Sequence, residues 1–479
     1  MKNPSLALYF GSRAISAAGN LVSVAVFARL VGPAEYGAYI LMFAWAIVVY
    51  GFATQWMKFS YFGIYRAAHE NAIIASYIRL VALAIAAVSI VALALIVFDP
   101  SQRDFIFALV ALFVGMTIYE AALEISRTRL QVTTVALSMI CRAVFVLALG
   151  CVFLAVHHSA FSLALGVAAG HLIAAVPTLA RLRSLPWTST SWVSTSGNSY
   201  KAFLKYGWPL IFSFGIFAIG QTIDRFLIGK YVGNAVLGPY GVVADLMRQS
   251  FLVVGESIAL ALITIAKKHA DEGRRDDSDA VMRSTFRACV AAGSFGAAFF
   301  IVFGHGLTKL FLGAEFAAPV DGIIPIFAVA FGFMLLRSFY FGQVIYFTNG
   351  TLLELFVAAI FVLSSSTIAF ILVPGVGPLG GAVGGAIALL IAHAVSCVIS
   401  ALVGRRLHAF PVDVPALLEI PAVAALCILL CWLVGDALPM AAALAVQVAL
   451  LAAAAGFVAW RFDLMQLVMS GYRPRPGET

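Results

Sequence analysis

The sequence predicts an all-α polytopic membrane protein with about fourteen membrane-spanning helices. The first observation behind this fold class is composition: 63% of the 479 residues are hydrophobic and only 11% are charged, whereas soluble domains carry about 25% charged residues. The second is the length of the apolar runs, many of which reach the roughly 20 residues that a helix needs to cross the hydrocarbon of a bilayer. Runs of this length also exclude the short alternating strands of a membrane β-barrel.

The candidate spans follow one another with short connections. They lie near residues 6–30, 36–57, 72–98, 105–124, 132–156, 160–180, 203–228, 235–265, 284–304, 320–344, 351–373, 380–403, 416–435 and 438–460. The longest connections, near 181–202 and 266–283, are too small for a soluble catalytic domain, and no Walker A loop is present. We therefore expect no enzyme activity, and any energy for transport must come from an ion gradient, the membrane potential or the substrate gradient.

The loop charges predict how the chain is oriented. With the N-terminus in the cytoplasm, 20 Lys and Arg residues, Lys58 among them, fall on the cytoplasmic side and 3 on the outer side, while 7 lie in or at the ends of spans, which accounts for all 30. Cytoplasmic loops of membrane proteins are enriched in Lys and Arg, so both termini are expected in the cytoplasm. The same rule explains the net charge of +8 without a nucleic-acid partner.

An internal repeat indicates two similar halves. Residues 29–39 (RLVGPAEYGAY) align with residues 230–240 (KYVGNAVLGPY) at an offset of 201, and each copy follows the first helix of a half. The offset corresponds to six helices, an even number, so the halves enter the membrane in the same orientation and are related by a pseudo-two-fold axis along the membrane normal. We expect an N-terminal six-helix lobe (1–183), a cytoplasmic linker (184–202), a C-terminal six-helix lobe (203–408), and two extra helices with a short cytoplasmic tail (409–479).

Four segments resemble a known family. They are VGPAEYGAY at 31–39, YGWPL at 206–210 with DRFLIG at 224–229, LFLGAEF at 310–316, and GPLGGA at 377–382. In this order they resemble the Wzx-type polysaccharide and oligosaccharide (O-antigen) flippases. The resemblance covers nearly the whole chain and implies the MATE-like fold of the multidrug/oligosaccharidyl-lipid/polysaccharide exporter superfamily.

The resemblance also implies a function and a location. The expected activity is translocation of a polyprenyl-diphosphate-linked oligosaccharide across the bacterial inner membrane by alternating access, for surface polysaccharide or exopolysaccharide synthesis. The expected partners are that lipid-linked glycan, membrane lipids, and a polysaccharide polymerase with glycosyltransferases. Two alternatives stay open: a cation-coupled multidrug exporter of the same fold and a peptidoglycan-precursor flippase. A membrane polymerase or glycosyltransferase is disfavoured, because the outer loops are too short to carry its catalytic groups.

Ionisable residues at membrane depth are the candidate site residues, since such groups are costly in lipid and usually face a cavity or a partner. Arginine suits a diphosphate because its planar guanidinium binds two oxygens at once. The substrate-binding candidates are Arg13, Arg142, Arg337 and Arg248. The alternative for each is pairing with a carboxylate, and Asp245 lies one turn before Arg248 on the same helix face.

Buried carboxylates and histidines are candidates for a different role. Asp245, Glu256 and Asp224 could line the cavity or carry a coupling ion, with salt bridges as the alternative. His171 and His393 are expected to be hydrogen-bonded packing residues, with proton relay as the alternative. The six cysteines have neither disulfide nor zinc spacing, so no metal, cofactor or catalytic residue is expected.

Overall fold

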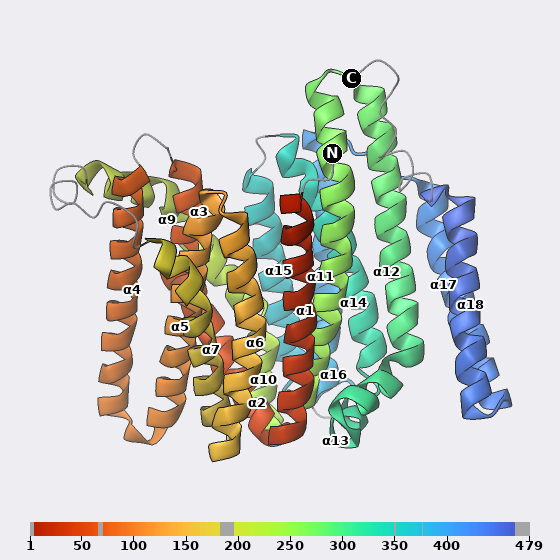
Figure 1. The fold of residues 1–479 in the computed structure, drawn as a ribbon. Helices are drawn as coiled ribbons and strands as arrows, with labels where there is room; N and C mark the ends of the chain where they lie inside the picture. Colours follow the sequence, from red (N-terminus) through yellow and green to blue (C-terminus); the bar gives the residue numbers. More distant parts are fainter. Residues whose placement is uncertain (1–3, 66–69, 183–195, 349–350, 376, 465–479) are drawn as a thin grey trace. The chain divides into compact units, whose positions relative to one another are not determined.

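The computed structural model describes residues 4–65, 70–182, 196–348, 351–375 and 377–464, and the chain divides into two compact units, Met1–Val242 and Val243–Thr479 (Figure 1). The helices of the first unit are α1 (Pro4–Val31), α2 (Pro33–Tyr50), η1 (Gly51–Gln55), α3 (Trp56–Ile64), α4 (Glu70–Phe98), η3 (Pro100–Gln102), α5 (Arg103–Thr128), α6 (Val132–Val156), α7 (Ala160–Leu182), α9 (Ser196–Gly220) and α10 (Ile223–Tyr231). The predicted linker at 184–202 falls largely outside the described residues, and the predicted domain boundaries stay predictions.

A long helix, α11 (Asn234–Asp271), begins in the first unit and ends in the second. The second unit continues with α12 (Arg275–Leu312), α13 (Ala314–Ala317), η4 (Ala318–Val320), α14 (Ile324–Phe339), η5 (Phe341–Tyr346), α15 (Thr351–Leu372), α16 (Gly381–Leu407), α17 (Val414–Ala437) and α18 (Met440–Arg461). No strand occurs among the described residues of either unit. The predicted all-α fold class is confirmed.

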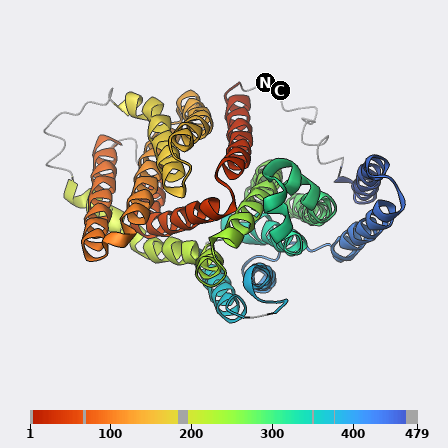
Figure 2. The ribbon, with the colours of Figure 1, turned by 90° about the horizontal axis from the view of Figure 1, so that it is seen from below.

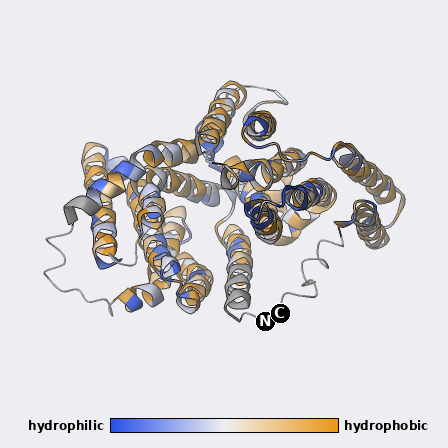
Figure 3. Ribbon diagram, turned by 90° about the horizontal axis from the view of Figure 1, so that it is seen from above, coloured by the Kyte–Doolittle hydropathy of each residue, from blue (hydrophilic) through white to orange (hydrophobic). Residues whose placement is uncertain are grey.

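Thirteen helices in the described ranges are long and apolar enough to cross a membrane, and Ile15–Val31 in α1 is a shorter apolar segment. Thirteen of the fourteen predicted spans therefore overlap one of these helices, and the first predicted span overlaps the shorter apolar segment. Orange, the colour of hydrophobic residues, is present on every group of helices in Figure 3. Large apolar side chains are exposed on α4 and α18, among them Leu83, Phe98 and Trp460. Exposed apolar faces of this extent indicate contact with lipid.

The predicted span 203–228 is divided in the structure. Helix α9 ends at Gly220 and α10 begins at Ile223, with Gln221 and Thr222 in a turn between them. The hydroxyl of Thr222 donates to the carbonyl of Ala218 at 2.8 Å, so a side chain bonds the backbone where the helix stops. Short polar side chains compete with the helical ladder in this way, which apolar run length does not reveal.

A π-helical turn lies within the second membrane span. Residues Gly51–Gln55 form η1, so Pro33–Ile64 is one continuous helix with a wider turn in its middle. The Thr54 hydroxyl lies 3.3 Å from the Thr117 hydroxyl on α5. A Cβ added to Gly51 would lie 3.0 Å from the Phe214 carbonyl oxygen on α9. The π turn thus fits between α5 and α9, and π turns inside α-helices often occur at functional positions.

The two C-terminal helices are attached to the second unit through α12. Figure 2 shows α17 and α18 as a pair at the edge of that unit, and α17 packs on α12. Asp413 caps α17 by accepting from the Ala416 amide at 3.2 Å, and it also accepts from Arg287 Nε on α12 at 2.5 Å. One carboxylate therefore both starts α17 and ties it to its neighbour.

Candidate functional site

A polar cavity lies among α1, α2, α6 and α7 in the first unit. Its volume is about 170 Å³. The residues that line it are Ser16, Asn20, Ser23, Val24, Phe27, Tyr36, Tyr39, Phe43, Arg142, Ala143, Val146, Val167 and His171. Within this described lining Arg142 is the one arginine or lysine, and neither an aspartate nor a glutamate is present. The cavity therefore has cationic character.

Arg142 extends from α6 toward α1. Its Nη2 donates to the Ser16 hydroxyl at 3.1 Å, and its guanidinium carbon lies 5.5 Å from the centre of the Tyr119 ring. No ion pair found among the described residues includes Arg142. A hydroxyl and an aromatic face orient this cation, and a carboxylate that interacts with it electrostatically, Glu120, forms its ion pair with Lys58 instead.

The face of α1 that meets the Arg142 side chain consists of small, polar residues. Ser12, Ser16 and Ser23 recur at helical spacing and are all buried. Ser23 satisfies its hydroxyl locally by donating to the Gly19 carbonyl at 2.8 Å. A Cβ on Gly19 would lie 2.6 Å from the Cβ of Ala143, so α1 and α6 pack closely beside Arg142. Small residues allow helices in a membrane to approach in this way.

The other side of the cavity is aromatic and contains a histidine. Tyr36 and Tyr39 of α2 pack edge to face, with ring centres 5.6 Å apart. On α7, His171 Nδ1 lies 2.8 Å from the Val167 carbonyl oxygen. Because a carbonyl only accepts, Nδ1 carries the proton and Nε2 is left with a lone pair. The cavity thus combines several donors with one imidazole acceptor.

These groups suit an anionic or hydroxylated ligand. The guanidinium, the Asn20 amide and the hydroxyls can donate to phosphate or sugar oxygens, and His171 can accept from a hydroxyl. A cationic ligand would find no lining carboxylate. The volume is below the 300–1,000 Å³ of typical small-molecule sites, so the cavity accommodates one part of a large substrate and not all of it.

The predicted cations have different surroundings in the structure. Arg142 lies in the cavity, whereas the side chain of Arg13 on α1 lies outside the described part of the structure. Arg337, at the end of α14, is 5% exposed and its Nη2 donates to Glu354 Oε1 at 2.5 Å. Arg248 on α11 pairs with Asp245 at 3.1 Å, the alternative that their spacing indicated. Of the three arginines whose side chains are described, Arg142 is the one that lines this cavity.

The predicted carboxylates also lie apart. Asp245 pairs with Arg248, and Glu256 is partly exposed on the same helix. Asp224 is 2% exposed at the start of α10 and accepts from the Tyr240 hydroxyl at 2.6 Å. None of the three lines the cavity. Clusters of three or more His, Cys, Asp or Glu able to hold a metal ion are absent from the described ranges.

Sequence reasoning missed two features. The hydroxyl and aromatic lining of the cavity comes from residues far apart in the chain, although the serine spacing on α1 was a usable signal. The second is an ion pair between Lys58 on α3 and Glu120 on α5, with Nζ and Oε2 2.7 Å apart. The predicted spans place Lys58 in a cytoplasmic loop, whereas in the structure it lies on α3 and its side chain is mostly buried.

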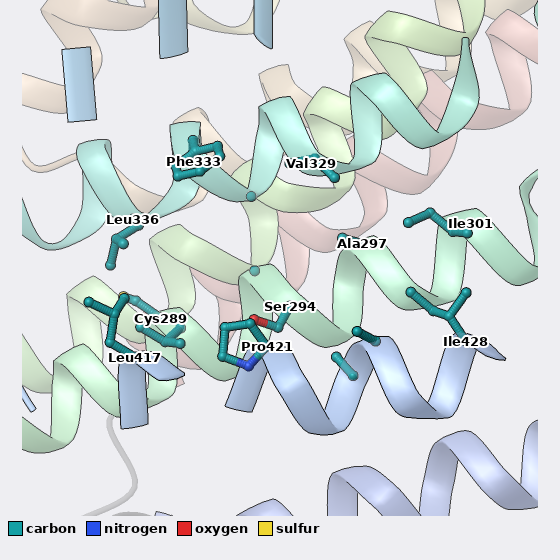
Figure 4. Close-up of a pocket in the computed structure, with 15 residues that line it drawn as sticks. Cys289, Ser294, Ala297, Ile301, Val329, Phe333, Leu336, Leu417, Pro421 and Ile428 are labelled. Atoms are coloured by element: carbon teal, nitrogen blue, oxygen red, sulfur yellow. The ribbon is translucent and has the colours of Figure 1, made fainter. Parts of the chain in front are cut away.

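The second unit contains a different pocket, shown in Figure 4. It has a volume of about 260 Å³ and lies between α12, α14 and α17. Its walls are almost wholly apolar, with Ser294 and Cys289 as the more polar members of the lining. A pocket of this kind can contact hydrocarbon but provides no charge for recognition.

Comparison with known proteins places the chain in a family and a fold. Residues 26–321, more than half of the chain, match the family described as "Polysaccharide biosynthesis protein". No curated protein matches the chain.

Solved transporter structures share the fold. A lipid II flippase MurJ in an inward closed conformation is similar with a TM-score of 0.71 and 14% identity, over 96% of this chain and 99% of that one. An inward-facing multidrug resistance MATE family transporter is similar with a TM-score of 0.60 and 14% identity, over 82% of this chain and 94% of that one. A transporter from Pyrococcus furiosus is similar with a TM-score of 0.54 and 15% identity, over 85% of this chain and 95% of that one. Its description reports reverse polarity of its binding pocket.

The four-motif resemblance, the family match and the shared fold agree. The chain is a multi-pass membrane protein with the fold of the MurJ and MATE transporters. It belongs to the polysaccharide biosynthesis protein family.

Proposed function

We propose that this protein is a flippase that translocates a polyprenyl-diphosphate-linked oligosaccharide across the bacterial inner membrane by alternating access. The cavity around Arg142 interacts with an anionic or hydroxylated part of the substrate. Both termini lie in the cytoplasm, and the product is used for surface or exopolysaccharide synthesis beside a polymerase and glycosyltransferases. The observation that carries this proposal is the cationic cavity in a chain of the polysaccharide biosynthesis family.

The charge of Arg142 supports an anionic ligand. A cation away from bulk water is costly unless an opposite charge compensates it, and two other arginines of the predicted spans, Arg248 and Arg337, pair with carboxylates. Arg142 has a serine and a tyrosine ring instead. A phosphate or another acidic group of the substrate supplies the missing negative charge.

The composition of the cavity argues against a cation-coupled drug exporter. A carboxylate or aromatic faces can bind a cationic drug, but here the aromatic rings of the lining stand beside the positive charge of Arg142, and the lining has no carboxylate. A peptidoglycan-precursor flippase is the remaining alternative. The experiment below separates the two by the identity of the lipid that accumulates.

Lipid analysis of cells lacking the protein tests the proposal. We expect accumulation of a polyprenyl-diphosphate oligosaccharide and loss of the matching surface polysaccharide. Accumulation of a peptidoglycan precursor would identify the alternative flippase. New sensitivity to cationic drugs without accumulation of any lipid-linked glycan would refute the proposal.

Variants of Arg142 test the cavity. Loss of a charge-assisted hydrogen bond costs about 1.5–3 kcal/mol, so Arg142→Ala should slow translocation by about 10- to 150-fold. Arg142→Lys keeps the charge but not the planar fork, and it should retain part of the activity. Arg274→Ala, on the exposed α11–α12 turn, is the matched control. Normal glycan export by Arg142→Ala at normal protein levels would exclude this cavity from the transport path.

A further inference from the structure

The cavity among α1, α2, α6 and α7 (the Arg142 cavity) has room for one ring of the substrate. An internal cavity of about 150 Å³ in another protein accommodates one benzene molecule, and the Arg142 cavity has a volume of about 170 Å³. A six-membered sugar ring therefore fits, whereas an oligosaccharide with its lipid carrier does not. The part of the substrate that enters the cavity is then either one sugar or the diphosphate.

The Arg142 cavity provides a single positive charge. Arg142 is the one arginine or lysine in its described lining, and this cation also interacts electrostatically with Glu120. A diphosphate that joins a lipid to a sugar carries one negative charge on each phosphate. The charge of the second phosphate would lie among tyrosine, phenylalanine and valine side chains without a cation, which is costly. The cavity therefore matches a ligand group with one negative charge.

The His171 imidazole favours a ligand with hydroxyl groups. Its Nδ1 donates to the Val167 carbonyl at 2.8 Å, so Nε2 is an acceptor. A diphosphate diester has no hydrogen to donate at neutral pH, whereas each free hydroxyl of a sugar donates one. His171 and Arg142 line the same cavity and interact electrostatically, so one ligand can contact both.

Tyr119, on α5, holds these two groups in place. Its side chain is 1% exposed, and its ring lies 5.5 Å from the Arg142 guanidinium carbon and 5.7 Å from the His171 ring. The Tyr119 hydroxyl interacts with the Ser138 hydroxyl, which donates to the Ala174 carbonyl at 2.5 Å. The cation and the acceptor are thus positioned before a ligand binds, which lowers the entropic cost of binding.

Aromatic side chains form another wall of the Arg142 cavity. The Tyr39 ring lies between those of Tyr36 and Phe43, with ring centres 5.6 and 5.9 Å apart, and all three line the cavity. One face of a sugar ring consists of polarised C–H groups, which the negative π face of an aromatic ring attracts. A diphosphate has no such face. The aromatic wall therefore also favours a sugar.

We propose that the Arg142 cavity binds one sugar of the transported glycan that carries a single carboxylate, such as a hexuronic acid, and not the diphosphate. The carboxylate accepts hydrogen bonds from the planar guanidinium, a ring hydroxyl donates to His171 Nε2, and the C–H face of the ring packs on the aromatic wall. This inference rests on the proposed function for the origin of the sugar, but binding of the sugar is measurable without transport.

Ligand binding to the purified protein in detergent micelles tests the inference. The probes are two anionic sugars, methyl glucuronide and methyl galacturonide, the neutral methyl glucoside, and inorganic diphosphate as a competitor. By saturation-transfer NMR we expect the uronides to bind and the glucoside to bind about 10- to 150-fold more weakly, because it lacks a charge-assisted hydrogen bond to Arg142. Diphosphate at the same concentration should not displace the uronides.

Variants assign the binding to the cavity. Arg142→Gln should weaken uronide binding by the same factor, and His171→Leu by about 2- to 12-fold, because it removes one neutral hydrogen bond. Arg103→Gln is the matched control, since it removes an exposed guanidinium at the start of α5, and it should bind as the wild type does. The unfolding temperature of each variant shows whether it is folded.

Three results would overturn the inference. They are no binding of either uronide to the wild-type protein, equal binding to the wild-type and Arg142→Gln proteins, and displacement of the uronides by an equal concentration of diphosphate. The second and third results would exclude the carboxylate contact and the preference for a sugar, respectively. The first and third need the wild-type protein only, so they do not depend on the folding of a variant.

The lipid that accumulates in cells lacking the protein separates this inference from the proposed function. Accumulation of a lipid-linked glycan without any carboxylated sugar would support the flippase and refute the sugar site. Binding of uronides through Arg142, in a protein whose deletion causes no lipid-linked glycan to accumulate, would support the sugar site and refute the proposed function.

Discussion

The buried ion pair between Lys58 and Glu120 should contribute measurably to stability. Its atoms are 2.7 Å apart, and the two side chains are only 21% and 26% exposed. The pair joins α3 to α5 just after the π turn. We consider Lys58→Met and Glu120→Gln, which remove one charge each at similar size, together with the double variant.

The expected energies follow from this geometry. Two unit charges at this distance attract by roughly 6 kcal/mol at an effective dielectric constant near 20, and most of that offsets their loss of hydration. Removing one partner of a fully buried pair costs about 3–5 kcal/mol. Because both groups retain some contact with solvent, we expect about 2–3 kcal/mol for Lys58→Met, which leaves the carboxylate alone.

The two single variants should differ. Lysine has a long, flexible stem that can carry its ammonium group toward the membrane surface when its partner is lost. Glu120 is shorter and lies well inside α5, so it cannot escape in the same way. Glu120→Gln should therefore cost only about 1–2 kcal/mol, on the same grounds.

A double-mutant cycle on the purified protein measures the coupling between the two residues. Reversible unfolding in mixed detergent micelles gives the free energy of unfolding of each variant, and the coupling energy should be about 2 kcal/mol. Arg103→Met with Asp104→Asn, an exposed ion pair at the start of α5, is the control and should show a coupling energy of about 0–1 kcal/mol. Additive effects for Lys58 and Glu120, within about 0.5 kcal/mol, would refute the reasoning.

Two further predictions concern single hydrogen-bonded carboxylates. Asp413→Ala removes the N-cap of α17 and its ion pair with Arg287. It should lower the free energy of unfolding by about 1–2 kcal/mol and speed proteolysis near α17. The control is Asp436→Ala at the exposed end of that helix, which should have neither effect. Tyr240→Phe removes the hydroxyl that donates to the buried Asp224 and should cost about 1–3 kcal/mol in the same unfolding assay.

Either prediction can fail clearly. Equal proteolysis rates for the Asp413→Ala and Asp436→Ala proteins would show that the cap and the ion pair are not what holds α17. A Tyr240→Phe protein as stable as the wild type would show that Asp224 finds other donors of equal strength.

The helical membrane fold could be predicted because the signal is local. The thickness of the bilayer sets the length of every span, which is about 20 residues for a helix. An apolar run such as 132–156 reaches this length whatever residues it contacts in the folded protein. The break at Thr222 could not be predicted in this way. It depends on one hydroxyl bonding one carbonyl inside a segment whose length and overall hydrophobicity are those of a single span.

The candidate site was only partly predictable for a related reason. Charge at membrane depth identified Arg142, but the same criterion selected Arg248 and Arg337, which have carboxylate partners in the structure. Whether a cation is compensated depends on residues distant in sequence, as with Ser16 and Arg142, which are 126 residues apart. One sequence contains the residues of such a contact but not their pairing.

The π turn at Gly51–Gln55 has a consequence for how this chain compares with its relatives. The wider π turn holds one residue more than a regular turn of α-helix. Each residue after it is therefore rotated by about 100° from the position it would have in a regular α-helix with the same sequence. Lys58 faces Glu120 in the rotated register. A regular helix with the same number of residues would turn Lys58 away, whereas removing one residue between 51 and 55 would allow a regular helix that keeps Lys58 facing Glu120. At this position, therefore, the number of residues carries information that their identities do not: an alignment gap of one would mark relatives whose helix is regular here and still presents the same face to α5.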